Sequence, residues 1–169
     1  MLRKATEKDI ARIAEILVFT KRTTYRDIFK NDHVSFNVIQ VLSEAENLKK
    51  PNALENQYVY DDGVVKAIIN AEVMENEIKL SDFYVDPFFQ NEGIGTFMMK
   101  KFMDDAKKDG KKLWFWVLNK NVRAIEFYEK LGFKYSGIKE EFEDSGFYIL
   151  RYEMYGVKAA KYLLQFFTN

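Results

Sequence analysis

Residues 81–96 read SDFYVDPFFQNEGIGT, and this stretch decides the fold. The residues up to Val85 are typical of a strand, and Asp86-Pro87 ends it. The segment Gln90-Asn91-Glu92-Gly93-Ile94-Gly95-Thr96 then leads into a helix. Its glycines let the backbone turn several N–H groups toward one point, where the helix N-terminus adds a positive dipole. The pattern predicts a site for an anion such as a pyrophosphate, although a tight strand-to-helix turn would need the same glycines.

Two familiar phosphate-binding loops do not match this segment. A Rossmann fingerprint would carry a third glycine after Gly95, and a P-loop would carry Lys followed by Ser or Thr there. A nucleotide-binding protein of another fold is therefore the weaker alternative.

On the N-terminal side of this stretch, apolar spacing predicts a strand, two helices and three further strands. Thr6 and Asp9 have capping-box spacing, so a helix is expected over residues 10–17. Residues 20–34 lack clean periodicity and are expected to form a loop or a broken helix. The other elements expected here are a strand over 2–5, a short helix over 36–42, and strands over 57–60, 64–74 and 78–85.

The C-terminal side continues with a helix over residues 96–108, a strand over 113–118, a helix over 122–131 and an antiparallel pair over 133–139 and 146–154. The continuous apolar run LWFWVL, residues 113–118, is typical of a strand buried on both faces. The element order is therefore βααβββαβαββ. A strand–helix–strand–helix segment beside antiparallel hairpins predicts an α/β fold: a mixed, mostly antiparallel central sheet with helices on both faces.

The composition narrows the function classes. The 169 residues are the size of one domain, and 26 basic side chains balance 26 acidic ones, so nucleic acid is not an expected partner. The chain has no Cys and one His, His33, which excludes thiolate and multi-histidine metal sites. No apolar run reaches the ~18 residues of a membrane span, and no signal-peptide pattern begins the chain. We expect a cytoplasmic protein with no metal and no membrane partner.

Two separate blocks of this sequence resemble the GNAT superfamily of acyl-CoA-dependent N-acetyltransferases. The first is Phe83-Tyr84-Val85-Asp86-Pro87 followed by Gln90-x-x-Gly93-Ile94-Gly95, which is similar to the acetyl-CoA signature of that family. The second is Asn121-x-x-Ala124-x-x-Phe127-Tyr128-Glu129-Lys130-Leu131-Gly132-Phe133. The element order agrees with the family over residues 1–154, which we expect to be one GNAT domain. Asn91 stands where many members have Gly, and Asn tolerates a left-handed backbone better than most residues.

The resemblance implies that acetyl-CoA is the co-substrate and that the loop binds it. Main-chain N–H groups of residues 91–96 would hold the pyrophosphate. The strand ending at Val85 would splay away from strand 113–118, leaving backbone groups of Phe83 and Val85 to bind the pantetheine arm. The cofactor contacts of the family carry over to Phe83, Tyr84, Val85, Gln90, Asn91, Glu92, Gly93, Ile94, Gly95, Thr96, Asn121, Ala124, Phe127 and Tyr128.

The same resemblance implies catalytic roles for Tyr128 and Phe83. Tyr128 would protonate the thiolate of coenzyme A as it leaves, and a backbone N–H near Phe83 would polarise the thioester carbonyl. On helical spacing alone, Tyr128 would instead be an apolar-face aromatic of its helix. Transfer in the family is direct, with no covalent nucleophile, so catalysis would rest on positioning. Lys130 would reach a phosphate of coenzyme A or lie in solvent as a surface lysine.

The acceptor amine must lose a proton before it attacks, because an alkylamine has a pKa of about 10.4. Asp82 is the first candidate for this base, and Glu72 is the second. The stretch Ser81-Asp82-Phe83-Tyr84-Val85 is similar to the Glu-Asp-Phe-Phe-Val stretch of diamine and polyamine acetyltransferases, with Ser81 in place of the first acid. The alternative for Asp82 is a charge at the edge of a sheet.

Residues 24–29 lie where members of the family place a mobile lid over the acceptor, so Tyr25 and Phe29 are expected to contact it. An ordinary packing segment is the alternative, and His33 nearby is a weak candidate base. Residues 155–169 extend past the usual end of the family. Their apolar side chains are expected to pack on the domain or on a second subunit of a homodimer.

These observations predict transfer of an acetyl group from acetyl-CoA to a primary amine. Asp82 slightly favours a small, polyamine-like acceptor. A protein N-terminal amine or a lysine side chain stays open, because a fold does not fix the acceptor. A non-catalytic acyl-CoA-binding regulatory module is the rival class. The presence of both Asn121 and Tyr128 argues against such a module, because it needs no proton donor.

Overall fold

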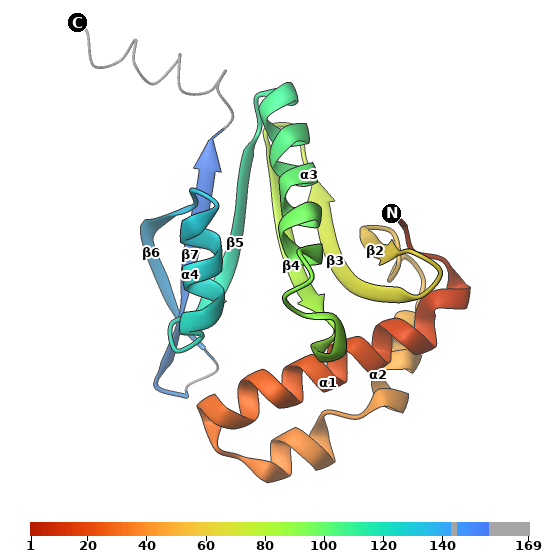
Figure 1. Ribbon diagram of the computed structural model, residues 1–169. Coiled ribbons are helices and arrows are strands. Elements are labelled where there is room, and N and C mark those ends of the chain that lie inside the picture. The colour runs from red at the N-terminus through yellow and green to blue at the C-terminus, as the bar shows by residue number, and fades with distance from the viewer. Residues whose placement is uncertain (143–144, 156–169) are drawn as a thin grey trace, which may run out of the picture. The chain divides into compact units, whose positions relative to one another are not determined.

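The computed structural model describes residues 1–142 and 145–155, and the chain packs as two compact units (Figure 1). The first unit contains Met1–Ala71 and Asp82–Met99. The second contains Glu72–Ser81 and the described residues from 100 onward. Of the expected C-terminal extension, residues 155–169, only Tyr155 is described, and it belongs to the last strand; the remainder lies outside the described residues.

The first unit combines antiparallel strands with a pair of helices. β1 (Leu2–Lys4) pairs with β2 (Gln57–Asp61), and β2 pairs with β3 (Val65–Val73). After the turn η1 (Glu7–Asp9), α1 (Ile10–Phe29) is followed by the π-helix η2 (Val34–Val38) and by α2 (Val41–Leu48). α1 and α2 lie side by side in Figure 1. The unit also holds the end of β4 (Glu77–Val85), the turn η3 (Pro87–Phe89) and the start of α3 (Ile94–Asp109).

The core of the first unit forms between α1 and two strands. It consists of Ile13, Ile16, Leu17, Val59, Val65 and Ile68. The three α1 members are Ile13, Ile16 and Leu17. Ile16 and Leu17 follow Ile13 by three and four residues, which places all three on one face of the helix. Burial of side chains of this size contributes about 1.5–3 kcal/mol each. The amphipathic pattern of α1 therefore fixes this helix against β2 and β3.

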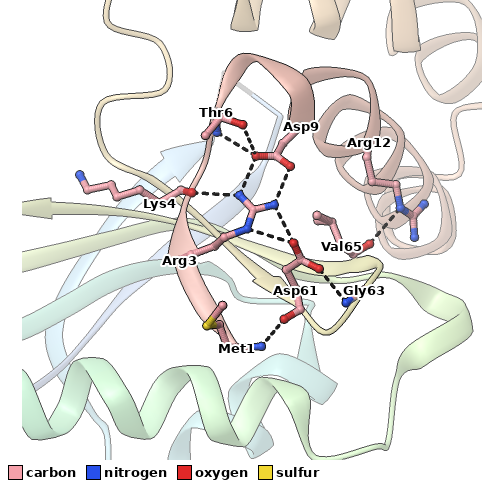
Figure 2. Close-up of polar contacts among 9 residues, drawn as sticks. All are labelled: Met1, Arg3, Lys4, Thr6, Asp9, Arg12, Asp61, Gly63 and Val65. Carbon is pink, nitrogen blue, oxygen red and sulfur yellow. Dashed lines mark hydrogen bonds and ion pairs between the residues drawn. The ribbon is translucent and has the colours of Figure 1, made fainter.

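An ionic cluster joins β1 to the start of α1 and to the end of β2 (Figure 2). Arg3 donates to both carboxylate oxygens of Asp9 at 2.8 Å and to Asp61 at 2.8 Å. Asp9 also accepts the N–H of Thr6 at 2.8 Å, as the capping-box spacing predicts. The hydrogen bonds from Arg3 hold the pKa of the Asp9 carboxyl well below its usual range. The start of α1 is thus fixed by charge as well as by apolar packing.

The described part of the second unit contains the first residues of β4, the strands β5 (Lys112–Leu118), β6 (Lys134–Phe142) and β7 (Phe147–Tyr155), residues 100–109 of α3 and the helix α4 (Val122–Lys130). β5 runs parallel to the first residues of β4 and antiparallel to β7, and β7 pairs with β6. Figure 1 shows α4 beside β6 and β7. Phe115 of β5 packs beneath this helix, with its ring centroid 4.0 Å from that of Tyr128 and 4.9 Å from that of Phe133. Aromatic packing therefore holds α4 on the strands.

The hydrogen-bonded strands follow the order β1-β2-β3-β4-β5-β7-β6. β4 and β5 run parallel, whereas the pairs β1–β2, β2–β3, β5–β7 and β6–β7 are antiparallel. The order of helices and strands is the one that the sequence predicts. The α/β fold with a mixed, mostly antiparallel sheet is therefore confirmed.

The segment 20–34, expected to be a loop or a broken helix, is a broken helix: α1 continues to Phe29, left-handed Lys30 ends it, and η2 begins at Val34. The guanidinium of Arg22 donates to the carbonyls of Ser35 and Ile39, both at 2.9 Å. These partners lie beyond the helix, so the local periodicity of residues 20–29 did not reveal them. The short helix expected over 36–42 is wrong in its bounds, since extended backbone at Ile39 separates η2 from α2.

The expectation that β5 is buried on both faces is wrong for part of the strand. Leu113, Phe115 and Val117 are buried, but the alternate residues Trp114 and Trp116 are only half-buried. The guanidinium of Arg151 lies 4.1 Å from the ring centroid of Trp114, as in a cation–π contact. A cation therefore covers part of a face on which an apolar layer was expected.

Candidate active site

β4 contains a left-handed residue at Asp82, where the backbone takes a φ of 45°. Such a left-handed residue inside a strand is uncommon for any residue except Gly, and it re-aims the side chains around it. Asp82 is exposed to solvent, whereas Phe83, Tyr84 and Val85 are half-buried. The candidate base therefore stands in solvent on a local irregularity of the strand that leads to the loop.

The loop expected to bind pyrophosphate has two left-handed positions, Asn91 with a φ of 67° and Gly93 with a φ of 82°. α3 begins directly afterward at Ile94, and the N–H of Phe97 donates to the carbonyl of Gly93 at 2.9 Å. A Cβ on Gly93 would meet no atom within 4 Å, so the backbone conformation, not a lack of space, favours glycine there. Asn91 adopts the conformation that its residue type tolerates.

This backbone geometry suits an anion. The N–H groups in the first turn of α3 have no earlier carbonyl within the helix to accept them, and the helix dipole makes this end positive. Left-handed residues among ordinary ones turn successive N–H groups into a concave nest. Asn91, Glu92 and Gly93 are exposed, so a ligand has access to their main chain. The residues present therefore fit a diphosphate such as that of coenzyme A.

A turn that starts at buried Asp86 comes directly before the loop. The Asp86 carboxylate accepts the N–H of Phe88 at 2.8 Å, and the main-chain N–H of Asp86 donates to the carbonyl of Lys66 at 2.9 Å. The side-chain amide of Gln90 donates to the carbonyl of Val85 at 3.1 Å. Gln90, which was expected to contact the cofactor, thus uses its amide to close the turn that precedes the loop.

In the second unit, Asn121 and Tyr128 lie at opposite ends of α4. Asn121 is the N-cap of the helix, and its side-chain oxygen accepts the N–H of Ala124 at 3.3 Å. Tyr128 is half-buried, with its ring centroid 4.0 Å from that of Phe115 and 5.3 Å from that of Phe127. These contacts fit a packing aromatic. A ring held between other rings also suits a proton donor, because its orientation is fixed.

The acceptor candidates Tyr25 and Phe29 lie near the end of α1, in the segment that was expected to be a loop or a broken helix. The hydroxyl oxygens of Tyr25 and Tyr84 are 3.3 Å apart, and the rings of Tyr25 and Phe29 are in edge contact with centroids 5.8 Å apart. All three side chains are half-buried. The structure therefore brings Tyr25, Phe29 and Tyr84 together. His33, unlike these three residues, is exposed. Its ring nitrogen lies 3.4 Å from the side-chain amide of Asn37.

The remaining candidates are surface residues of the second unit. Glu72 in β3 and Lys130 at the end of α4 are both exposed. Within residues 1–142 and 145–155, no group of three His, Asp or Glu side chains is placed to hold a metal ion. Over the same ranges, no helix has the length and apolar character of a membrane span.

Comparison with known proteins identifies the family of this chain. The family described as the acetyltransferase (GNAT) family matches residues 22–133, which is more than half of the chain. The chain belongs to the GNAT acetyltransferase family.

Relatives of this GNAT chain match over parts of their length. It is 31% identical over 88 residues to the ribosomal protein bS18-alanine N-acetyltransferase of Escherichia coli strain K12, covering 52% of this chain and 60% of that protein. It is 42% identical over 57 residues to an uncharacterised N-acetyltransferase of Methanocaldococcus jannaschii, covering 33% of this chain and 25% of that one. The chain therefore spans a quarter to three fifths of the length of these relatives.

Solved structures share the GNAT fold. The PaiA N-acetyltransferase of Thermoplasma acidophilum, in complex with coenzyme A, has a TM-score of 0.70 at 21% identity, covering 89% of this chain and 96% of that chain. The ribosomal-protein-S18-alanine N-acetyltransferase of Escherichia coli has a TM-score of 0.62 at 20% identity, covering 92% of both chains. At these identities the similarity shows the fold alone.

Two polar contacts of this GNAT chain were not predicted from the sequence. Arg12 of α1 binds Asp86, at the start of the turn that precedes the GNAT loop. The hydroxyl of Tyr152 donates to Glu129 at 2.9 Å, next to Tyr128 in α4. Burial, and then this contact with Glu129, raises the pKa of Tyr152 to about 12, so it is a neutral phenol at physiological pH. Both pairs join residues far apart in the chain, so local sequence patterns did not indicate them. The position of Asp86 before a proline indicated only that the strand ends there.

Proposed function

We propose that this protein is an N-acetyltransferase that transfers the acetyl group of acetyl-CoA directly to a primary amine. The proposal is carried by the loop over residues 90–96, where left-handed Asn91 and Gly93 precede the start of α3 in a chain of the GNAT family. Relatives named as N-acetyltransferases support the same reaction class.

We assign a group of this chain to each step of the proposed reaction. Main-chain N–H groups of residues 91–96 bind the diphosphate, and the backbone at Phe83 and Val85 binds the pantetheine arm. The N–H near Phe83 donates to the carbonyl under attack. Asp82 takes the proton of the amine, directly or through water, and Tyr128 delivers a proton to the sulfur that leaves. Acetyl-CoA supplies the activated acetyl group, while the protein supplies position.

A small, polyamine-like amine is the first candidate acceptor. Tyr25, Phe29 and Tyr84 form an aromatic group in the first unit, and Asp82 adds an exposed carboxylate to the same unit. An alkylammonium group is attracted both to aromatic faces and to a carboxylate. This composition supports a cationic acceptor over a neutral one.

A protein N-terminal amine is the second candidate, with a lysine side chain as its variant. The observation in its favour is the 31% identity over 88 residues to a protein named as an alanine N-acetyltransferase of ribosomal protein bS18. A peptide acceptor would also present a primary amine to Asp82. A cytoplasmic location and a homodimer stay predictions from the sequence.

The test is release of free thiol from acetyl-CoA with a panel of amines. The panel contains a diamine, a polyamine, a peptide with a free N-terminal alanine, and the same peptide with a blocked N-terminus and one internal lysine. Turnover with the polyamine supports the first candidate, and turnover with either peptide supports the second. Binding of acetyl-CoA without turnover on any amine would favour a non-catalytic module. A chain that binds no acetyl-CoA would refute the proposal itself.

A further inference from the structure

The turn before the loop is tied to α1 by a single guanidinium group. Arg12 donates from Nη2 to the Asp86 carboxylate, from Nε to the Val65 carbonyl at 3.0 Å and from Nη1 to Glu15 at 2.6 Å. Figure 2 shows Arg12 reaching from its helix to the carbonyl of Val65. One side chain therefore connects α1 with β3 and with the residue that follows β4.

Asp86 links the guanidinium of Arg12 to the backbone of the turn. Its side chain is only 3% exposed, against 26% for that of Arg12. One carboxylate oxygen accepts from Arg12, and the other accepts the N–H of Phe88 in η3. The carbonyl of Asp86 accepts the N–H of Phe89 at 2.9 Å. Asp86 is thus bonded on both its side chain and its main chain, and it fixes where the chain turns away from the sheet.

The path from this turn to the anion-binding backbone is short. Four residues separate Asp86 from Asn91, the first left-handed position of the loop. Gln90 closes this path by its hydrogen bond to Val85. Because main-chain N–H groups point in directions set by their φ and ψ angles, a displacement at Asp86 would redirect the N–H groups that follow. Electrostatic binding by fixed dipoles depends on such preorganisation.

We infer that Arg12 and Asp86 are positioning residues for the binding of a diphosphate by residues 91–96. They act through the loop, by holding the turn from which it starts. The inference rests on the proposed function, since the diphosphate is that of coenzyme A. It goes further in assigning part of the binding affinity to a residue of α1 that lies 74 positions before its partner.

A second arginine in the same unit provides a matched control. Arg3 also binds a nearly buried carboxylate, that of Asp9. Like Arg12, it joins α1 to a strand, since it also binds Asp61 at the end of β2. Its partners Asp9 and Asp61 lie outside residues 86–96. Loss of Arg3 should therefore reduce stability in a comparable way without moving the turn at Asp86.

The experiment compares Arg12→Met with Arg3→Met in the full chain. Thermal unfolding measures stability, and calorimetric titration with coenzyme A measures Kd at a temperature at which both variants are folded. Both variants should have a lower Tm. Arg12→Met should weaken coenzyme A binding about tenfold or more, since small misplacements of binding groups have effects of this order, while Arg3→Met should leave the Kd nearly unchanged. At saturating acetyl-CoA, Arg12→Met should regain most of kcat, so that the defect lies in KM for acetyl-CoA.

The double variant Arg12→Met/Asp86→Asn separates positioning from stability. It leaves no buried charge without a partner, and the Asn oxygen can still accept from Phe88, so much of the lost Tm should return. The Kd should stay weak, because the tie to α1 is still absent. Recovery of the Kd together with the Tm would show that Arg12 acts only on stability and would overturn the inference.

Amide hydrogen exchange without any ligand tests the inference independently. Arg12→Met should accelerate exchange over residues 88–96, whereas Arg3→Met should not. Faster exchange together with unchanged Kd would refute the positioning role. If the wild-type chain bound no coenzyme A, the proposed function would fail and the inference with it. If all variants bound as tightly as the wild type, only the inference would fail.

Discussion

The hydroxyl groups of Tyr25 and Tyr84 lie 3.3 Å apart and join the last turns of α1 to the end of β4. Tyr84 also packs against the apolar core of the first unit, which fixes the position of its ring. Tyr25 reaches it from the last part of α1. The pair is thus presented by two ordered elements, and its phenol oxygens are suited to orient a polar acceptor.

Replacement of either phenol should weaken binding of the acceptor amine. Tyr25→Phe and Tyr84→Phe each remove one hydroxyl and keep the ring. A hydrogen bond contributes about 0.5–1.5 kcal/mol, so KM for the amine should rise roughly threefold to tenfold. Initial rates at saturating acetyl-CoA measure this change. Tyr148→Phe, at an exposed position of β7, is the control. Two variants with unchanged KM would remove the pair from the acceptor site.

Tyr128→Phe should lower kcat by about a hundredfold or more, the usual contribution of a positioned proton donor. The ring contact with Phe115 is retained, so folding and the Kd for coenzyme A should stay close to wild type. Single-turnover kinetics and titration with coenzyme A measure the two quantities separately. Tyr135→Phe, an exposed tyrosine of the same unit, is the control. Unaltered turnover would assign Tyr128 to packing alone.

Gly93→Ala should weaken coenzyme A binding, because its φ of 82° is unfavourable for a residue with a Cβ. Gly63→Ala is the control, since Gly63 has a φ of 106° in a hairpin turn and its Cβ would also meet no atom within 4 Å. Each variant should lose about 1–2 kcal/mol of stability. Only Gly93→Ala should change the Kd, and equal Kd values for both would contradict the role of the loop. Asn91→Gly should bind as well as wild type.

Asp82→Asn should lower kcat/KM for the amine about a hundredfold near neutral pH, because the general base is lost. Part of the rate should return at high pH, where an amine with a pKa of about 10.4 loses its proton to solvent. A pH–rate profile of both proteins tests this. Glu72→Gln is the paired variant: a defect there and none in Asp82→Asn would move the base to Glu72.

The free energy of unfolding should fall in acid because of Asp9. Its pKa is lowered in the folded state by the hydrogen bonds from Arg3, so the folded protein binds fewer protons than the unfolded chain. The stabilisation is present above the unfolded carboxyl pKa of about 3.9 and is lost as the pH falls below it. Asp9→Asn should be less stable by about 2 kcal/mol at neutral pH and should have a flatter acid limb. Urea unfolding at a series of pH values measures both; Asp105→Asn, in a more exposed ion pair, should retain the wild-type slope.

Local chemistry explains which features were predictable from the sequence. Asn91 and Gly93 are residue types that accept a left-handed backbone, and the apolar spacing on either side of them fixes a strand and a helix. Thr6 and Asp9 likewise mark the start of α1 within four residues. In each case the residues that decide the structure are close together in the chain.

The features that were not predicted depend on distant partners. For residues 20–29 the sequence left both a loop and a helix open, and the carbonyls that Arg22 binds belong to residues after the end of α1. Arg12 and Asp86 meet across 74 positions, so neither residue type alone indicated a pair. The residues next to Asp82 in the sequence do not indicate its left-handed backbone. The chemical roles of Asp82 and Tyr128 were implied by resemblance and stay predictions.

The chain passes between the two units at three places, within β3, β4 and α3. Neither unit is therefore a continuous stretch of the gene, and no single cut of the gene isolates the first one. During synthesis the first unit cannot be completed until residue 99 has left the ribosome, when residues 72–81 of the second are already made. The two units are thus interleaved parts of one polypeptide.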